Sequence, residues 1–167
     1  MVIRMNRVDK TNYYLNIAET VCDRSTCLRR KFGAVIVKDD EIISTGYNGA
    51  PRGRMNCSDI GSCYRAMMNV PRGQRYELCR SVHAEANAII SAARSEMIGA
   101  DLYLACHDAE TNQLDSAVEP CSMCKRLILN AGIRSVYVKE SDGQFVKIDV
   151  RSWIEADDSL RENQTGY

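Results

Sequence analysis

Apolar positions along this chain recur in two alternating periods. Residues 10–25 carry them at helical spacing, and residues 32–48 hold two apolar runs on either side of Lys38-Asp39-Asp40, which predicts a β-hairpin. The same reasoning predicts helices over 83–97 and 121–131, strands over 101–106 and 133–140, and a further strand or short helix over 144–154. Alternating strands and helices of this kind predict an α/β layered domain.

One long stretch, residues 49–80, breaks this alternation. It is rich in Gly, Pro, Arg and Cys and shows no sustained period. A loop of that length inside a compact domain is usually functional, or is held by something other than its own apolar core. No low-complexity segment or linker divides the chain. We therefore expect a single domain over 1–167 that carries a cysteine-bearing insertion at about 49–80.

Charge and cysteine content narrow the functional classes. The 22 basic residues balance the 22 acidic ones, which favours a small-molecule partner over nucleic acid. No stretch is apolar and long enough to span a bilayer or to serve as a signal peptide, so we expect no membrane partner and a cytoplasmic protein. Thiols stay reduced in that compartment, and the eight cysteines therefore indicate metal binding or catalysis rather than disulfides.

Two short motifs carry candidate chemistry, and each precedes a predicted helix. Cys121 and Cys124 form a Cys-x-x-Cys pair after Pro120, so both thiols fall on one helical face. Together with the imidazole of His83 they supply three ligands, which suits a catalytic zinc that keeps its fourth position open. Glu85, two residues beyond His83, is placed to take a proton from a water at that position.

Each motif alone has a simpler interpretation. A His-x-Glu at a helix start is most often a cap or a surface pair. A Cys-x-x-Cys is also compatible with half of a structural zinc site or with a redox pair. Both motifs stand at predicted strand-to-helix junctions, however, and their combination favours the catalytic zinc.

These motifs, His83-Ala84-Glu85 and Pro120-Cys121-Ser122-Met123-Cys124, resemble the signature of the cytidine deaminase superfamily. The resemblance extends from about Cys27 to Lys139. "GYNGAPRG" and the cysteine-bearing insertion after it are similar in particular to the deoxycytidylate deaminase branch. This resemblance implies a three-layer α/β/α fold with a mixed central sheet of about five strands. It also implies deamination of dCMP to dUMP, with Glu85 as the proton carrier and with Asn48 and Ala84 holding base and sugar.

The resemblance implies further ligands and partners. The branch often carries a second, structural zinc, for which Cys27, Cys57, Cys63 and Cys79 are the candidate ligands. Cys22 and Cys106 we assign to the core. Members of the branch are typically homo-oligomers, often hexamers. Their typical effectors are dCTP, together with Mg2+, and dTTP. A phosphate on the substrate needs cationic partners, and the candidates are Arg29, Arg30, Lys31, Arg52 and Arg54, of which we expect one or two to serve.

Other functions remain open at this point. The stretch "HDAETNQLDSAV" separates the strand at 101–106 from Pro120 by more than in many relatives, and we expect His107 in it to be a solvated loop residue. "EPCSMC" resembles the tRNA-adenosine deaminases, and free cytidine or guanine are alternative substrates. A zinc-stabilised binding domain without catalysis is the alternative of another class. Glu85 argues against it, because a structural zinc needs no carboxylate beside its ligands.

Overall fold

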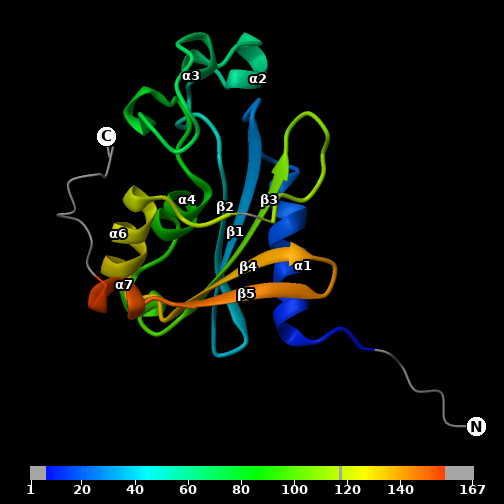
Figure 1. Ribbon diagram of the computed structural model, residues 1–167. Coiled ribbons are helices and arrows are strands. Elements are labelled where there is room, and N and C mark those ends of the chain that lie inside the picture. Colours follow the sequence, from blue (N-terminus) through cyan, green and yellow to red (C-terminus); the bar gives the residue numbers. More distant parts are fainter. Residues whose placement is uncertain (1–6, 117, 157–167) are drawn as a thin grey trace, which may run out of the picture.

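A mixed five-stranded sheet forms the centre of the molecule, as a computed structural model of residues 7–116 and 118–156 shows (Figure 1). The strands are β1 (Arg30–Lys38), β2 (Glu41–Tyr47), β3 (Asp101–Asp108), β4 (Ser135–Ser141) and β5 (Gln144–Asp149). Their order is β2-β1-β3-β4-β5, in which β3 and β4 run parallel and the other neighbours antiparallel. The prediction of a mixed sheet of this size is confirmed. The expected domain, 1–167, includes residues outside the described ranges.

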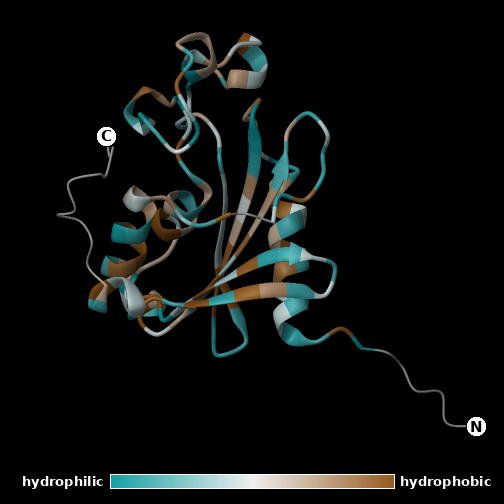
Figure 2. Ribbon diagram, viewed as in Figure 1, coloured by the Kyte–Doolittle hydropathy of each residue, from teal (hydrophilic) through white to brown (hydrophobic). Residues whose placement is uncertain are grey.

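Helices cover both faces of this sheet. The helices of the main body are α1 (Lys10–Cys22), α4 (Ala84–Ile90), α5 (Arg94–Met97), α6 (Ser122–Ala131) and α7 (Ser152–Glu155). One apolar cluster joins α1 to β1 and β3, and a second cluster joins α4, α5 and α6 to the opposite face. Figure 2 shows the hydrophobic colour along the middle of the sheet and the polar colour at the β1–β2 turn. The three-layer α/β/α prediction is therefore confirmed.

Two glycines let the helices approach the sheet closely. A Cβ atom on Gly33 of β1 would lie 2.0 Å from the carbonyl oxygen of Ala18 in α1. On the other face, a Cβ atom on Gly46 of β2 would lie 2.3 Å from the carbonyl oxygen of Ala84 in α4. Only glycine fits at such distances. The start of α4 is thus held directly against β2.

The insertion lies between β2 and α4, beyond one end of the strands (Figure 1). It contains three single-turn helices: α2 (Cys57–Ile60), α3 (Tyr64–Met67) and η1 (Tyr76–Leu78). Its two ends meet, because Gly49 and Val82 exchange backbone hydrogen bonds of 3.2 and 2.8 Å. The insertion is therefore a loop whose two ends are paired, and α4 begins directly after it.

Some predicted boundaries are wrong. The helix expected over 83–97 is two helices, because the chain turns after Ile90 and Glu96 accepts a hydrogen bond from the backbone N–H of Ala93, which starts α5. Ile90 is 76% exposed, so its apolar side chain does not mark a buried face. His107 is part of β3 rather than of a solvated loop, and its Nε2 lies 2.8 Å from Glu19. Residues 144–154 contain both alternatives, β5 and then α7.

Within residues 7–116 and 118–156, no helix combines the length and the apolar character needed to cross a membrane.

Candidate active site

His83 and Cys121 occupy the same structural position in two neighbouring helices. His83 is the N-cap of α4 and Cys121 is the N-cap of α6, and both have extended backbone dihedrals. The Sγ atom of Cys121 accepts a hydrogen bond from the backbone N–H of Cys124, with an N···S distance of 3.5 Å. The sequence folds in this way because each motif residue ends an extended segment where a helix begins.

The three predicted ligands converge on one point. Nδ1 of His83 lies 3.5 Å from Sγ of Cys121 and 3.4 Å from Sγ of Cys124. In a tetrahedral zinc site with Zn–S bonds of roughly 2.3 Å, nitrogen and sulfur ligands are separated by about 3.6 Å. The donor atoms therefore match the separation that zinc requires. Across the described residues, this is the one group of three such side chains whose ligand atoms all lie within 4.8 Å of one another.

Ionisation in this cluster affects metal binding in two opposite ways. The pKa of the Cys121 thiol falls to about 4, because the thiol of Cys124 and then the imidazole of His83 hydrogen-bond to its sulfur. Burial lowers the pKa of His83, but hydrogen bonds to Cys121 and Cys79 outweigh burial and raise it to about 10. A cation that binds here thus meets a thiolate, and it must displace a proton from the imidazole.

Glu85 stands in the first turn of α4 beside this cluster. Its side chain is buried, and burial raises the pKa of its carboxyl group although the charge of His83 acts in the opposite direction. A buried carboxyl group with a raised pKa can accept and return a proton near neutral pH. The structure thus brings Glu85 together with the three candidate ligands.

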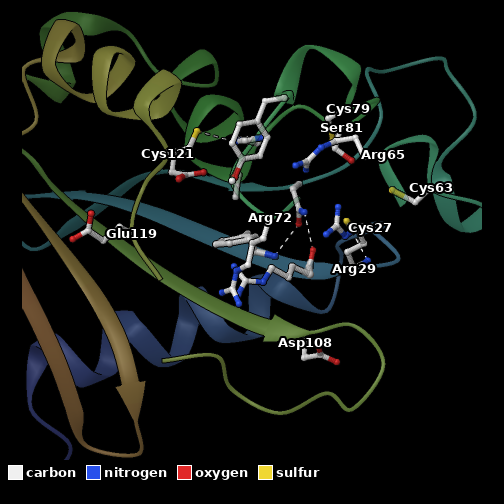
Figure 3. A pocket seen from close by; sticks show the side chains of 18 residues that line it. Cys27, Arg29, Cys63, Arg65, Arg72, Cys79, Ser81, Asp108, Glu119 and Cys121 are labelled. Carbon is white, nitrogen blue, oxygen red and sulfur yellow. Dashed lines mark hydrogen bonds between the residues drawn. The ribbon is translucent and has the colours of Figure 1, made fainter. Parts of the chain in front are cut away.

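A cavity of about 310 Å³ opens in front of these residues (Figure 3). In Figure 3, Cys121 lies on the side of α6, while Arg65, Cys79 and Ser81 lie on the side of the insertion. Cavities of this size are typical of small-molecule sites. His83, Ala84 and Glu85 all contribute to its wall.

Both predicted substrate-binding residues lie in the wall of this cavity. Ala84 and Asn48 line it, and both are buried. The amide of Asn48 already makes protein contacts, because its Oδ1 accepts from the backbone N–H of Phe32 at 2.8 Å and its Nδ2 donates to the carbonyl oxygen of Arg30 at 2.9 Å. Asn48 therefore shapes the cavity wall through the backbone of β1.

The five basic residues predicted as candidates for phosphate binding divide into two groups. Arg29 and Arg30 line the cavity, whereas Lys31, Arg52 and Arg54 are not among the lining residues. Sequence reasoning missed Arg65, Arg72 and Tyr76, which the insertion contributes to the wall. No periodicity or motif in residues 49–80 distinguishes these three from their neighbours.

The four cysteines proposed for a second metal gather near the insertion. Cys27, Cys63 and Cys79 line the cavity, and Cys57 is buried nearby. Burial raises the pKa of Cys57, and the other three thiols add to that effect through their charge, so the four thiols are electrostatic neighbours. No three of these described thiols come within 4.8 Å of one another.

The two cysteines assigned to the core behave as expected. Cys22 and Cys106 are each 1% exposed, and Sγ of Cys22 donates to the carbonyl oxygen of Ala105 at 3.3 Å. Burial raises the pKa of both thiols, which keeps them protonated.

Comparison with known proteins gives a consistent result. The family model described as the cytidine and deoxycytidylate deaminase zinc-binding region matches residues 8–140. A deoxycytidylate deaminase of Mycobacterium phage D29 is 43% identical over 143 residues, covering 82% of this chain and 100% of that protein. That of Schizosaccharomyces pombe is 34% identical over 125 residues, covering 75% of this chain but only 35% of the yeast protein.

Solved structures agree with the sequence comparison. The dCMP deaminase of cyanophage S-TIM5, in complex with dCMP and dUMP, has a TM-score of 0.54 and 26% identity to this chain, covering 79% of this chain and 83% of the phage chain. A cytidine deaminase from Burkholderia pseudomallei, at 14% identity and a TM-score of 0.50, shares the fold.

Proposed function

This chain belongs to the cytidine and deoxycytidylate deaminase family, and on that basis we propose that it catalyses the zinc-dependent hydrolytic deamination of dCMP to dUMP. Water is consumed and ammonia is released, and the product feeds thymidylate synthesis. The observation that carries this proposal is the convergence of His83, Cys121 and Cys124 beside a buried Glu85, at the wall of a cavity of about 310 Å³.

His83, Cys121 and Cys124 would hold the catalytic zinc. Zinc with three such ligands supplies, at its fourth position, a water whose pKa falls to roughly 7. The N–H groups at the starts of α4 and α6 face the same region and favour the thiolates and the negative charge that develops on the substrate ring.

Glu85 carries the protons of the reaction. It accepts one from the attacking water, whose oxygen bonds to the amine-bearing ring carbon, and passes that proton to the adjacent ring nitrogen. It then moves the second proton, from the new hydroxyl group on that carbon, to the amine, so that the carbonyl group forms, the carbon–nitrogen bond breaks and ammonia leaves. The burial that raises the pKa of Glu85 supports this role, because a fully solvated carboxylate would hold the proton too weakly. The backbone around Ala84 and the region of Asn48 would hold the base and sugar.

We also propose a second, structural zinc held by Cys27, Cys57, Cys63 and Cys79. Their proximity around a stretch with three single-turn helices supports this proposal. A closed four-cysteine site contributes folding free energy directly, and it would hold an insertion that has little apolar core of its own. The four sulfurs must move closer together when the metal binds.

Assembly and regulation follow from the family as proposals. We propose a homo-oligomer, a hexamer, with dCTP (together with Mg2+) and dTTP as effectors. Sedimentation that shows a monomer at working concentration would contradict the assembly, and a hyperbolic rate curve indifferent to both triphosphates would contradict the regulation. We also propose a cytoplasmic location, where thiols stay reduced and available as metal ligands.

Ammonia release from a panel of substrates tests the function. The zinc-loaded protein is assayed with dCMP, deoxycytidine, cytidine, guanine and an adenosine-bearing tRNA. Ammonia from dCMP above all others supports the proposal. Preference for another substrate would indicate that the protein belongs to a different branch of the family. If none of the substrates yields ammonia, the protein is instead a zinc-stabilised binding domain.

A further inference from the structure

Four arginines line the cavity, and an acidic residue neutralises two of them. Asp115 accepts a hydrogen bond from Arg30 and another, of 3.2 Å, from Arg72. Its carboxylate is only 20% exposed, so the ion pair with Arg30, which is 22% exposed, is partly desolvated. Arg30 and Arg72 therefore have an internal counter-charge.

The other two arginines have donor atoms without an acceptor. Nε of Arg65 and Nη1 of Arg29 are buried and have no hydrogen-bond partner among residues 7–116 and 118–156. Arg65 as a whole residue is 7% exposed. Buried donors on a charged group are almost always paired, since leaving them unpaired forfeits hydration without a replacement. Such atoms in a cavity wall indicate a missing acceptor.

The guanidinium group of Arg65 is held in place by other contacts. Its Nη2 donates to the carbonyl oxygens of Pro71 and Gln74, at 3.3 and 2.5 Å. The guanidinium carbon also lies 4.6 Å from the ring centroid of Tyr76. The orientation of Nε is therefore set before any ligand arrives, which reduces the entropy lost on binding.

Tyr76 connects this arginine to the metal ligands. Its ring meets the imidazole of His83 edge-on, with centroids 4.9 Å apart and planes at 80°. One aromatic ring thus separates the guanidinium of Arg65 from His83. This spacing suits a nucleotide, whose sugar stands between the reacting base and the phosphate.

We propose that Arg65 and Arg29 form the anion subsite of this cavity and bind the 5′-phosphate of the substrate. The proposal rests on the proposed function, and it makes Arg65 the residue that selects a nucleoside monophosphate over a free nucleoside. Arg30 and Arg72, paired with Asp115, shape the wall without serving as the anchor. Tyr76 is a positioning residue between the two ends of the substrate.

Arg65→Gln tests the assignment in the zinc-loaded full-length protein. The ratio of kcat/KM for dCMP to kcat/KM for deoxycytidine should fall at least tenfold. An equal loss for both substrates would show that Arg65 only maintains the fold of the insertion, and would overturn the proposal. Arg52→Gln is the matched control, since Arg52 is an exposed arginine of the same insertion outside the cavity. In Arg52→Gln, the ratio of kcat/KM for dCMP to kcat/KM for deoxycytidine should stay within twofold of the ratio in the parent protein. A fall as large as that in Arg65→Gln would also overturn the proposal.

Arg29→Gln provides a second variant, should Arg65→Gln fail to fold. It removes the other unpaired donor without touching the loop carbonyls at Pro71 and Gln74. We expect the same ratio to fall at least fivefold, and an unchanged ratio would overturn the role of Arg29.

Inorganic phosphate separates failure of this subsite from failure of the proposed function. It should raise the melting temperature of the parent protein more than that of Arg65→Gln, whatever reaction the protein catalyses. If dCMP yields no ammonia but this difference is seen, the function is wrong and the anion subsite stands. If dCMP is deaminated but phosphate stabilises both proteins equally, the subsite is wrong and the function stands.

Discussion

Nδ1 of His83 lies 3.4 Å from Sγ of Cys124, although the two residues are 41 positions apart in the chain. The sheet produces this contact, because α4 packs on β2 and β1 while α6 follows β3 and packs against α4. The candidate metal site is therefore a consequence of the layer that these two helices form.

Cys124→Ala should abolish the catalytic metal site. The side chain of Cys124 is fully buried, so alanine fits without strain, but the site keeps only two ligands. We expect one zinc per chain to be lost in elemental analysis and turnover to fall by orders of magnitude. Cys106→Ala removes an equally buried thiol outside the site and should retain the zinc and the activity. Normal zinc content with normal turnover in Cys124→Ala would refute the ligand assignment.

Glu85→Gln should separate metal binding from proton transfer. Glutamine has the shape of glutamate and cannot carry the proton, so we expect unchanged zinc content and a loss in kcat of about 10²–10⁴-fold. The measurement is steady-state ammonia release alongside elemental analysis. A variant that retains more than a tenth of the parent rate would show that another group moves the proton.

Cys57→Ser tests the second zinc. The parent protein should contain nearly two zincs per chain, and the variant should lose one of them. Because Cys57 lies in the insertion and not among the catalytic ligands, its loss should lower the melting temperature more than it alters turnover by the surviving site. Cys22→Ser, at a buried position in α1, serves as the control and should keep both metals. One zinc per chain in the parent, unchanged in Cys57→Ser, would exclude the second site.

The sequence predicts the catalytic cluster better than it predicts the rest of the cavity. His83, Cys121 and Cys124 each stand in a short motif whose spacing follows from the local helix start, so this cluster of candidate ligands could be predicted without a structure. Arg65 and Arg72 stand in a stretch without periodicity, and only the return of the insertion to Val82 brings them to the same wall. Contacts of that kind depend on tertiary packing.

The break between α4 and α5 could not be predicted for a related reason. Apolar residues continue at helical spacing through Met97, and the sequence gives no proline or glycine between Ile90 and Arg94. The turn is favoured because it buries Met97, which is 3% exposed, in the core beneath α6. The prediction of a solvated loop at His107 is wrong because β3 extends two residues beyond its apolar run, and Glu19 of α1 pairs with the imidazole there.

Lys139 should influence how strongly the free energy of unfolding falls at acid pH. It is 1% exposed in β4 and forms an ion pair with Glu19 as well as a hydrogen bond of 2.8 Å to Asn16. Burial raises the pKa of Glu19, but the hydrogen bonds and charges of Lys139 and His107 outweigh burial and hold it below its ordinary value of 4.5. A lowered carboxyl pKa stabilises the fold fully above 4.5, and this contribution is lost as the pH falls through the folded-state pKa.

Lys139→Met should therefore lower the free energy of unfolding at pH 7 by about 1–3 kcal/mol. It should also reduce the loss of stability between about pH 5 and pH 3, because the pKa of Glu19 then returns toward its unfolded value. Urea denaturation at several pH values measures both effects. Lys147→Met, at an exposed position of β5, should leave the pH profile of the parent. A parent-like profile in Lys139→Met would show that the ion pair contributes nothing to acid sensitivity.

The central claim, that this protein deaminates dCMP in preference to the free nucleoside, is tested most directly by comparing dCMP with deoxycytidine as substrates of the zinc-loaded protein. Ammonia release and the accompanying change in ultraviolet absorption give kcat/KM for each. A phosphate held by charged, partly desolvated groups predicts that dCMP is converted to dUMP at least about tenfold more efficiently. Equal efficiencies, a preference for deoxycytidine, or no ammonia from dCMP would contradict the account.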